Sequence, residues 1–202
     1  MPRILCIETA TEVCSVSLHV PGRAPVELRS EARGVHSEAL FRFIQDLLAA
    51  ADLRLADLDA IAISAGPGSY TGLRIGASAV KGLLFGTDTP VYAVDTLHAI
   101  QAMAQRTHPQ ARIHSMIDAR RQHAYALSPG GASGLIELTE FAKTLRPGDV
   151  VAGTGAHRLP PESLIGVLRM GTESISALGV HAVVESGGSQ SIRAVDLEPL
   201  YF

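Results

Sequence analysis

Residues 62–76, AISAGPGSYTGLRIG, place a Gly-Pro-Gly turn between an apolar run and a helical pattern. Residues 58–64 are short, apolar and bounded by this turn, which is typical of a buried, parallel strand. After the turn, apolar residues recur at helical spacing from Thr71 to Leu84, at Leu73, Ala77, Val80 and Leu84. The stretch therefore predicts a strand, a tight turn and the first residues of a helix.

Three familiar glycine-rich motifs do not fit this turn. A dinucleotide-binding loop requires Gly-x-Gly-x-x-Gly, but the sixth residue counted from Gly66 is Thr71. A Walker loop requires a Gly-Lys pair, and a nucleophile elbow requires glycines where Ser69 has Pro67 and Thr71. Two interpretations stay open: an anion-binding loop rich in backbone N–H groups, or a tight turn with a helix cap. The candidate anion-binding residues are Gly66, Gly68, Ser69, Thr71, Gly72 and Arg74.

The segments on either side of this stretch predict an α/β fold. Residues 3–8, 14–20 and 26–33 read as three strands of an antiparallel meander. Residues 37–53 carry apolar side chains at helical spacing, with Ser37 as the expected N-cap and Glu38 in the first turn. Residues 90–95 follow as another strand. The predicted order is βββαβα, then β.

After Asp95 the pattern repeats less regularly and predicts a second, smaller α/β lobe. The expected elements are a helix at 96–105, strands near 112–118 and 123–128, a glycine loop at 130–134, a helix at 139–145 and a strand at 149–153. We therefore expect an N-terminal lobe over residues 1–98 and a second lobe over residues 99–173. A helix at 174–186, with the tail to residue 202, is expected to return to the first lobe.

Composition limits the possible functions. With 202 residues and 47% hydrophobic composition, the chain can bury a substantial core. The net charge is -3, and 15 of the 17 basic residues are arginines spread without a run, so the chain lacks the basic footprint of an independent nucleic-acid binder. Cys6 and Cys14 are expected to be reduced core thiols. No leader pattern or long apolar run is present, so we expect a cytoplasmic protein without membrane association.

The helix after the turn keeps several small residues. Gly72, Gly76 and Gly82 each cost about 1 kcal/mol relative to alanine inside a helix, so their retention suggests a close approach of another element. Together with Ala79 they predict a small-residue face, and the helix at 37–53 is its expected neighbour. This face could serve packing within the chain, or both helices could form an interface with a second subunit.

Several segments resemble the bacterial TsaB (YeaZ) family. They are ILCIETATEVCSVSL, HSEAL, DLDAIAISAGPGSYTGLRIGASAVKGL, VDTLHAI and MIDARRQHAYAL. The similarity is dense from Ile4 to about Leu127, and the Gly-Pro-Gly-Ser-Tyr-Thr-Gly-Leu-Arg block is highly specific. The resemblance implies an actin/Hsp70-like (ASKHA, ribonuclease H-like) fold of two lobes, in agreement with the βββαβα order. It also implies a non-catalytic subunit for threonylcarbamoyl transfer to the adenosine next to the tRNA anticodon.

The resemblance further implies the partners. The chain would pair with a TsaD-type subunit that carries the metal and the active site, a TsaE-type ATPase would join them, and tRNA would be met only through the complex. Alone, the chain would form a homodimer through the same two helices. Carried over by position, the partner interface comprises His36, Ser37, Leu40, Phe43, Ile44, Leu47, Arg74, Ile75, Ala77, Ser78 and Lys81.

The chemistry expected of an enzyme is missing from the sequence. The resembling catalytic subunits hold a metal with two histidines one helical turn apart, whereas here His98 is followed by Ala102. None of the eight histidines shows His-x-x-x-His or His-x-His spacing. Where ATP-hydrolysing relatives use an aspartate and a glycine in the first hairpin, this chain has Glu8-Thr9-Ala10-Thr11, which argues against ATP hydrolysis. We therefore expect no catalytic residue, no metal and no cofactor.

Two other functional classes are conceivable on this fold. A glycoprotease-like peptidase would need a base beside Ser69, and the sequence identifies none. An ATP-binding, sugar-kinase-like enzyme is the other possibility on the same fold. The second lobe departs from the family, because Gln122 and His123 follow the Asp-Ala-Arg-Arg run where glutamate is usual. Asp118, Arg120 and Arg121 could form a polar cluster facing the cleft between the lobes, or only ordinary surface ion pairs.

Overall fold

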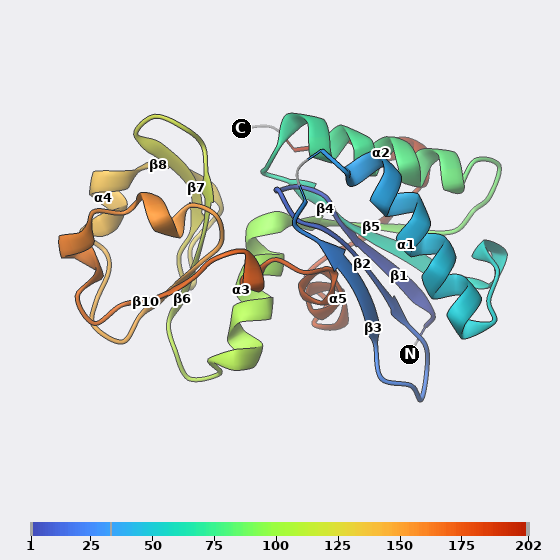
Figure 1. Cartoon of the computed structure of the whole chain (residues 1–202), viewed down its shortest axis with the longest axis horizontal. Helices are drawn as coiled ribbons and strands as arrows, with labels where there is room; N and C mark the ends of the chain where they lie inside the picture. Colours follow the sequence, from blue (N-terminus) through green and yellow to red (C-terminus); the bar gives the residue numbers. More distant parts are fainter. Residues whose placement is uncertain (1, 33, 201–202) are drawn as a thin grey trace.

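A computed structural model describes residues 2–32 and 34–200 of the chain. Arg33, the last residue of the predicted third strand, and residues 201–202 of the predicted tail lie outside the described residues. Figure 1 shows two sheets at opposite ends of an elongated molecule, with helix α3 between them. In the part of the chain that the structure describes, no helix combines the length and apolar character needed to cross a bilayer.

The first sheet confirms the predicted βββαβα order. Its six strands lie in the order β11-β5-β4-β1-β2-β3. They are β1 (Ile4–Glu8), β2 (Cys14–His19), β3 (Val26–Ser30), β4 (Ala60–Gly66), β5 (Val91–Asp95) and β11 (Ser191–Ile192). Strands β1, β2 and β3 form the antiparallel meander, and β4 pairs parallel with both β1 and β5. β11 pairs antiparallel with β5 and was not anticipated from the sequence.

Helices cover both faces of the first sheet (Figure 1). Because successive strand residues point to opposite faces, Leu5 and Ile7 pack under α1 (His36–Ala51) and α2 (Tyr70–Leu83). The alternate residue Cys6 packs instead with α3 (Thr96–Thr107) and α5 (Ala177–Glu185). Burial of β1 on both faces explains why it reads as a continuous apolar run, unlike an amphipathic strand.

The expected N-cap of the first helix is wrong. Helix α1 begins at His36, and the N-cap position belongs to Val35, which has no side-chain cap. Ser37 is exposed within the first turn, because the helix begins two residues earlier than the cap pattern indicates. Glu38 does lie in the first turn, where its charge favours the helix dipole.

The expected neighbour of the small-residue face is also wrong. The ideal Cβ of Gly72 would lie 2.0 Å from the carbonyl oxygen of Thr9, and that of Gly76 would lie 2.4 Å from Thr9 Oγ1. Gly72 and Gly76 therefore let α2 approach the turn after β1 and not α1, although α1 and α2 share one apolar cluster that includes Ala79. Gly82 meets nothing within 4 Å and lies on the exposed side.

The second sheet has five strands in the order β10-β9-β6-β7-β8. They are β6 (Ile113–Asp118), β7 (His123–Leu127), β8 (Gly134–Glu137), β9 (Val150–Ala152) and β10 (Leu168–Met170), with helix α4 (Leu138–Ala142). The strands around 112–118, 123–128 and 149–153 match β6, β7 and β9, whereas β8 and β10 were not anticipated.

Short 3-10 helices complete the described chain: η1 (Leu55–Asp57), η2 (Ala156–Arg158), η3 (Pro161–Leu164), η4 (Thr172–Ser174) and η5 (Ala194–Asp196).

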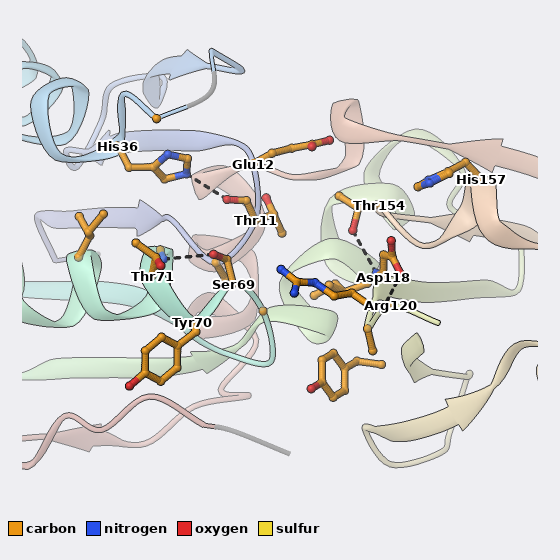
Figure 2. Close-up of a pocket in the computed structure, with 18 residues that line it drawn as sticks. Thr11, Glu12, His36, Ser69, Tyr70, Thr71, Asp118, Arg120, Thr154 and His157 are labelled. Carbon is orange, nitrogen blue, oxygen red and sulfur yellow. Dashed lines mark hydrogen bonds between the residues drawn. The ribbon is translucent and has the colours of Figure 1, made fainter. Parts of the chain in front are cut away.

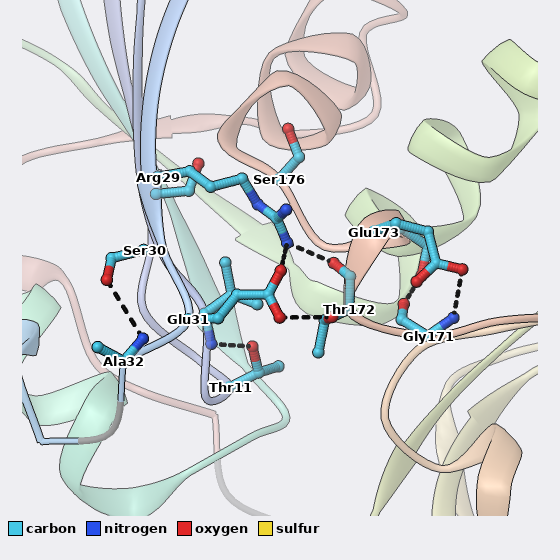
Figure 3. Close-up of polar contacts among 12 residues, drawn as sticks. Thr11, Arg29, Ser30, Glu31, Ala32, Gly171, Thr172, Glu173 and Ser176 are labelled. Atoms are coloured by element: carbon cyan, nitrogen blue, oxygen red, sulfur yellow. Dashed lines mark hydrogen bonds and ion pairs between the residues drawn. The ribbon is translucent and has the colours of Figure 1, made fainter.

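Apolar and polar contacts join the two sheets. Leu97 and Ile100 of α3 belong to one buried cluster with Ile113 and Val150 of the second sheet. At the edge of the first sheet, polar contacts link β3 to the segment around η4, which precedes α5 (Figure 3). Helix α5 then packs on the first sheet. The division into lobes at residues 98 and 173 stays a prediction.

Candidate functional site

A cleft of about 930 Å³ lies between the two sheets. One wall is formed by the turn after β1 and by the first residues of α2, and the other by the β6–β7 turn and the segment before η2 (Figure 2). Its polar lining residues are Thr11, Glu12, His36, Ser69, Tyr70, Thr71, Asp118, Arg120, Tyr125, Thr154 and His157. The glycine-rich stretch and the Asp-Ala-Arg-Arg run, about 50 residues apart in sequence, thus face the same space.

Glu8, the acidic residue of the first hairpin, does not line this cleft. Its side chain is 1% exposed and accepts hydrogen bonds from the backbone N–H of Ala10, at 2.7 Å, and from the Ser64 hydroxyl. Burial raises the pKa of this carboxyl to about 7, although both hydrogen bonds favour the charged form. Both carboxylate oxygens are therefore engaged within the first lobe.

The first residues of α2 are fixed on the turn after β1. Ser69 is the N-cap: its hydroxyl accepts from the Gly72 N–H at 3.3 Å, and its own N–H donates to the Ala10 carbonyl at 2.6 Å. The ideal Cβ of Gly68 would lie 2.1 Å from the same carbonyl oxygen, so glycine is required for this approach. The turn therefore has the tight, capped geometry of the second interpretation. Because the Ser69 cap does not occupy every N–H at the start of α2, anion binding by this loop stays open.

The candidate anion-binding residues are only partly brought together. Gly68, Ser69, Thr71 and Gly72 line the cleft. Gly66 does not: the Leu200 N–H donates to Ala65 at 2.6 Å, and the Leu200 carbonyl lies where a Gly66 side chain would be. The Arg74 guanidinium stacks 4.1 Å from the Tyr70 ring centroid and is not among the cleft-lining residues. Anion binding at this turn stays a prediction.

The β6–β7 turn forms the opposite wall. Arg120 and Arg121 both have left-handed backbone angles, with φ of 69° and 52°, which are uncommon for residues other than glycine. The Asp118 carboxylate holds the turn by accepting from Arg120 N at 2.8 Å and from Arg158 Nη1 at 2.6 Å. Arg158 also donates to the Arg121 carbonyl. In Figure 2 the Arg120 side chain points toward Ser69.

Both interpretations of the Asp118 cluster apply in part. Asp118 and Arg120 face the cleft, and Asp118 also forms an ion pair with Arg158. Sequence reasoning missed Arg158, which lies on η2 and is 40 residues from Asp118. It also missed Thr154, whose hydroxyl lies 3.3 Å from the Asp118 N–H. Neither residue stands in a pattern that could have indicated its position.

The predicted partner-interface residues divide between the core and the surface. The side chains that hold α1 and α2 on the sheet are Leu40, Phe43, Ile44, Leu47 and Ala77, all of them buried. Those that are exposed are Ser37, Arg74, Ser78 and Lys81. His36 and Ile75 are half-buried, and His36 donates through Nε2 to the Thr11 carbonyl at 3.0 Å.

A Ser-His-Asp chain in the second lobe has a structural role. His114 lies 3.1 Å from the Asp149 carboxylate and 3.0 Å from the Ser128 hydroxyl. However, His114 is 0% exposed under Phe141, and Arg112 donates to both oxygens of Asp149. No substrate could reach the imidazole without unpacking this lobe. The three hydrogen-bonded side chains therefore anchor β6 to the residue just before β9.

Metal-binding and thiol chemistry are not indicated in the described part of the chain. No group of three or more histidine, cysteine or acidic side chains there could hold a metal ion. Cys6 and Cys14 are free and buried. Burial strongly raises the pKa of the Cys6 thiol and raises that of Cys14 to about 11, so both are inert core thiols.

Comparisons with known proteins identify the family. A family model described as TsaD, tRNA N6-adenosine threonylcarbamoyltransferase, matches residues 30–145. The tRNA threonylcarbamoyladenosine biosynthesis protein TsaB of Haemophilus influenzae is 36% identical over 122 residues, which are 60% of this chain and 51% of that protein. Its Escherichia coli namesake is 37% identical over 123 residues, covering 61% and 53%. The chain thus spans about half the length of the curated relatives it matches.

Solved structures agree over the whole chain. YeaZ from Pseudomonas aeruginosa has a TM-score of 0.77 at 28% identity, with complete coverage of both chains. A second structure, described as an uncharacterized protein with similarity to peptidase YEAZ from Pseudomonas aeruginosa, has a TM-score of 0.79 at 28% identity, covering 100% and 99%. The two sheets and the helix arrangement define a two-lobed α/β protein of the actin/Hsp70-like, ribonuclease H-like class. Within that class, this chain belongs to the TsaB (YeaZ) family.

Proposed function

We propose that this chain is a cytoplasmic, non-catalytic subunit that supports a TsaD-type catalytic subunit. The reaction served is transfer of a threonylcarbamoyl group to the adenosine next to the tRNA anticodon. The position of Glu8 carries the proposal. A carboxylate that must position a metal and phosphates has to face the cleft, whereas Glu8 is buried and bonded to Ala10 and Ser64.

The contribution of such a subunit is an interface, which we place on the outer face of α1 and α2. The buried members of the predicted partner interface hold these helices on the sheet and cannot reach a partner. A partner would instead meet the exposed Ser37, Arg74, Ser78 and Lys81. Phe41 on α1 is 44% exposed and Phe85, just after α2, is 89% exposed, so both offer apolar area to the same interface.

The assembly we propose has further members. In the absence of the TsaD-type subunit, the chain pairs with a second copy of itself through this face. A TsaE-type ATPase joins the complex, and tRNA is engaged through the complex. The near-neutral net charge of -3 supports this last point, because binding to a phosphate backbone by one chain usually requires a basic surface.

We retain part of the anion-binding loop as a secondary proposal. The first N–H groups of a helix have no partner within the helix, and Ser69 and Thr71 lie at this end of α2. Arg120 points toward Ser69 from the opposite wall (Figure 2). An anionic group would therefore meet donors from both walls at Gly68, Ser69, Thr71 and Arg120.

Light scattering after size exclusion tests the interface. We expect a homodimer alone, and exchange into a one-to-one heterodimer when the TsaD-type subunit of the same organism is added. Ser78→Glu, on the exposed face of α2, should weaken both species. Ser186→Glu, the same change at the exposed end of α5, is the matched control. A folded Ser78→Glu variant that pairs normally would refute the interface assignment.

Reconstituted tRNA modification tests the subunit role separately. The TsaD-type subunit should transfer the threonylcarbamoyl group efficiently only when this chain is added, and Glu8→Gln should support transfer as well as the original chain. A monomeric chain that neither pairs nor stimulates transfer would overturn the proposal. Loss of transfer in Glu8→Gln, with pairing intact, would instead assign chemistry to this subunit.

A further inference from the structure

Two histidines form an unusual pair on the sheet face opposite α1 and α2. His19, at the end of β2, and His181, on α5, stack with ring centroids 3.4 Å apart and an interplanar angle of 7°. Their exposed fractions are 8% and 9%. Face-to-face stacking of two neutral rings is less favourable than an offset or edge-on arrangement, so packing alone does not favour this geometry.

The pair lines an open pocket of about 340 Å³. The turn between β2 and β3 contributes Arg23, the last turn of α3 contributes Arg106, and α5 contributes Glu185. No ion pair joins Arg23 or Arg106 to a carboxylate among residues 2–32 and 34–200. Two guanidinium groups and one carboxylate therefore leave the pocket with an excess of one positive charge in a chain that is negative overall.

The histidine rings keep hydrogen-bonding capacity for the pocket. His19 Nε2 lies 3.1 Å from the Ser17 hydroxyl, which satisfies one of its two ring nitrogens. His181 Nδ1 lies 4.0 Å from the Glu185 carboxylate, beyond hydrogen-bond distance. None of the remaining ring nitrogens is among the described buried polar atoms that lack a partner, and both rings line the pocket. His181 is thus a largely buried side chain, 11% exposed, on the wall of the pocket.

The electrostatics of the pocket favour an anion. Burial lowers the pKa of His19 to about 4, with further lowering by His181 and Arg106. Burial also lowers the pKa of His181, with Glu185 opposing the effect and Arg106 adding to it. A bound anion would offset the repulsion from Arg106 and allow one imidazole to take up a proton. The pocket thus places the two rings beside two guanidinium groups, with Glu185 as the one carboxylate among its lining residues.

The geometry disfavours a metal ion. Lone pairs of imidazole nitrogens lie in the ring plane, and the two planes here are nearly parallel and 3.4 Å apart. The lone pairs therefore do not converge on one point, and a metal bound to both rings would lie out of each plane. Donors from α3, α5 and the β2–β3 turn instead surround a space suited to a group with several acceptor oxygens.

We propose that this pocket binds a phosphate group, held by Arg106, His181 and Arg23 beside His19. The proposal is independent of the α1–α2 interface and of the subunit role. The shared chemistry is a tetrahedral oxyanion, which could come from free phosphate or from the backbone of a nucleic acid. Binding should favour protonation of the histidine pair, and lower pH should strengthen binding.

Histidine ring nitrogens followed by NMR in the ¹⁵N-labelled full chain provide the test. Inorganic phosphate is titrated against sodium chloride at matched ionic strength, and a short RNA oligonucleotide is the second probe. We expect phosphate to move the titration midpoints of His19 and His181 to higher pH in a saturable manner. A response to RNA at far lower concentration than to phosphate would assign the group to a nucleic-acid backbone.

Variants separate a site from a general salt effect. Arg106→Gln should abolish the phosphate-induced change, whereas Arg146→Gln, an exposed arginine in the second lobe, should leave it intact. The comparison uses the change on adding phosphate, because removal of Arg106 alone raises both midpoints. Equal responses to phosphate and chloride, or a phosphate response that persists in Arg106→Gln, would overturn the proposal. So would the absence of a response to both phosphate and RNA.

Discussion

The carbonyl oxygen of Thr9 occupies the space that a side chain at Gly72 would need, at 2.0 Å from the ideal Cβ position. One helical turn later, an ideal Cβ at Gly76 would lie 2.4 Å from Thr9 Oγ1 and 2.9 Å from the Ile63 side chain. Two glycines of α2 are therefore fitted to the turn after β1. This contact positions Ser69 and Thr71 on one wall of the cleft.

Gly72→Ala should destabilise the protein. Alanine normally stabilises a helix interior by about 1 kcal/mol relative to glycine. Here the added methyl group meets backbone, and overpacking of this kind costs about 1–3 kcal/mol. We expect a net loss in the free energy of unfolding measured with urea.

Gly82→Ala is the matched control on the same helix. Its ideal Cβ meets nothing within 4 Å, so the helix-propensity gain should appear unopposed. The two substitutions should thus change stability in opposite directions. Equal effects from both would show that α2 is not fitted to Thr9 in the way described.

The sequence contained enough local information for the first lobe. The apolar strands, the helical spacing of residues 37–53 and the break at Gly66-Pro67-Gly68 are each set by nearby residues, so the βββαβα order could be predicted. The resemblance to the TsaB (YeaZ) family then supplied the two-lobe fold. The short strands β8 and β10 read GLIE and LRM, which mix apolar with glycine or charged residues, whereas the equally short β9 reads VVA and stands out as an apolar run.

The missed features depend on contacts between distant residues. Glycine at 72 and 76 indicates that something comes close, but it does not indicate whether a helix or a turn does so. Arg158 joins Asp118 across 40 residues, and no spacing rule connects them. The predicted partner interface includes both exposed and buried residues. Apolar residues at helical spacing, such as Leu40 and Phe43, indicate that the helix packs on something, but not whether this is the chain's own sheet or a partner.

Glu8→Gln should change how stability depends on pH. The pKa of Glu8 is raised to about 7 in the folded chain from an ordinary value near 4.5. The unfolded chain therefore loses this proton first as pH rises, so Glu8 reduces stability between these two values, by up to about 1.4 kcal/mol per pH unit. Glutamine cannot ionise, and the stability difference between variant and original chain should grow in favour of glutamine from pH 4.5 to 7.

Urea unfolding at several pH values, with the difference taken at each pH, isolates this effect from other titrating groups. The exposed Glu162→Gln substitution serves as the control and should give a difference that stays flat. Parallel stability profiles for Glu8→Gln and the original chain would contradict the burial of an ionisable carboxylate at this position.

Arg29→Ala should loosen the connection between β3 and η4. Arg29 Nη2 donates to the Thr172 carbonyl at 2.7 Å and pairs with Glu31 at 3.0 Å, while the Thr172 hydroxyl donates to Glu31 at 2.9 Å (Figure 3). Glu31 is half-exposed, so the loss in global stability should be about 1 kcal/mol or less. Hydrogen exchange at the amides of Ser174 and Ile175 should become faster, because the 3-10 turn that protects them loses its anchor.

Arg193→Ala breaks an ordinary surface pair with Asp196 and is the control for this experiment. It should leave exchange at residues 172–175 unchanged. Arg29→Lys keeps the positive charge and tests whether the contacts need the guanidinium, whose Nη2 serves both Thr172 and Glu31. Unchanged exchange in Arg29→Ala would show that the contacts of Arg29 do not hold this segment.

Acid should destabilise the chain through the stacked histidines. The pKa of His19 is lowered to about 4 from 6.5, chiefly by burial, and that of His181 is lowered in the same direction. As pH falls below 6.5, the unfolded chain binds protons that these folded histidines resist, so their contribution to the free energy of unfolding falls until pH approaches 4.

His19→Gln removes one of the two titrating groups and should make this decline shallower. His123→Gln, at an exposed position of β7, is the control and should leave the slope unchanged. Phosphate at fixed ionic strength should partly restore the stability lost by the original chain, because a bound anion favours the protonated pair. A decline of equal slope in His19→Gln and the original chain would show that other groups cause the acid sensitivity.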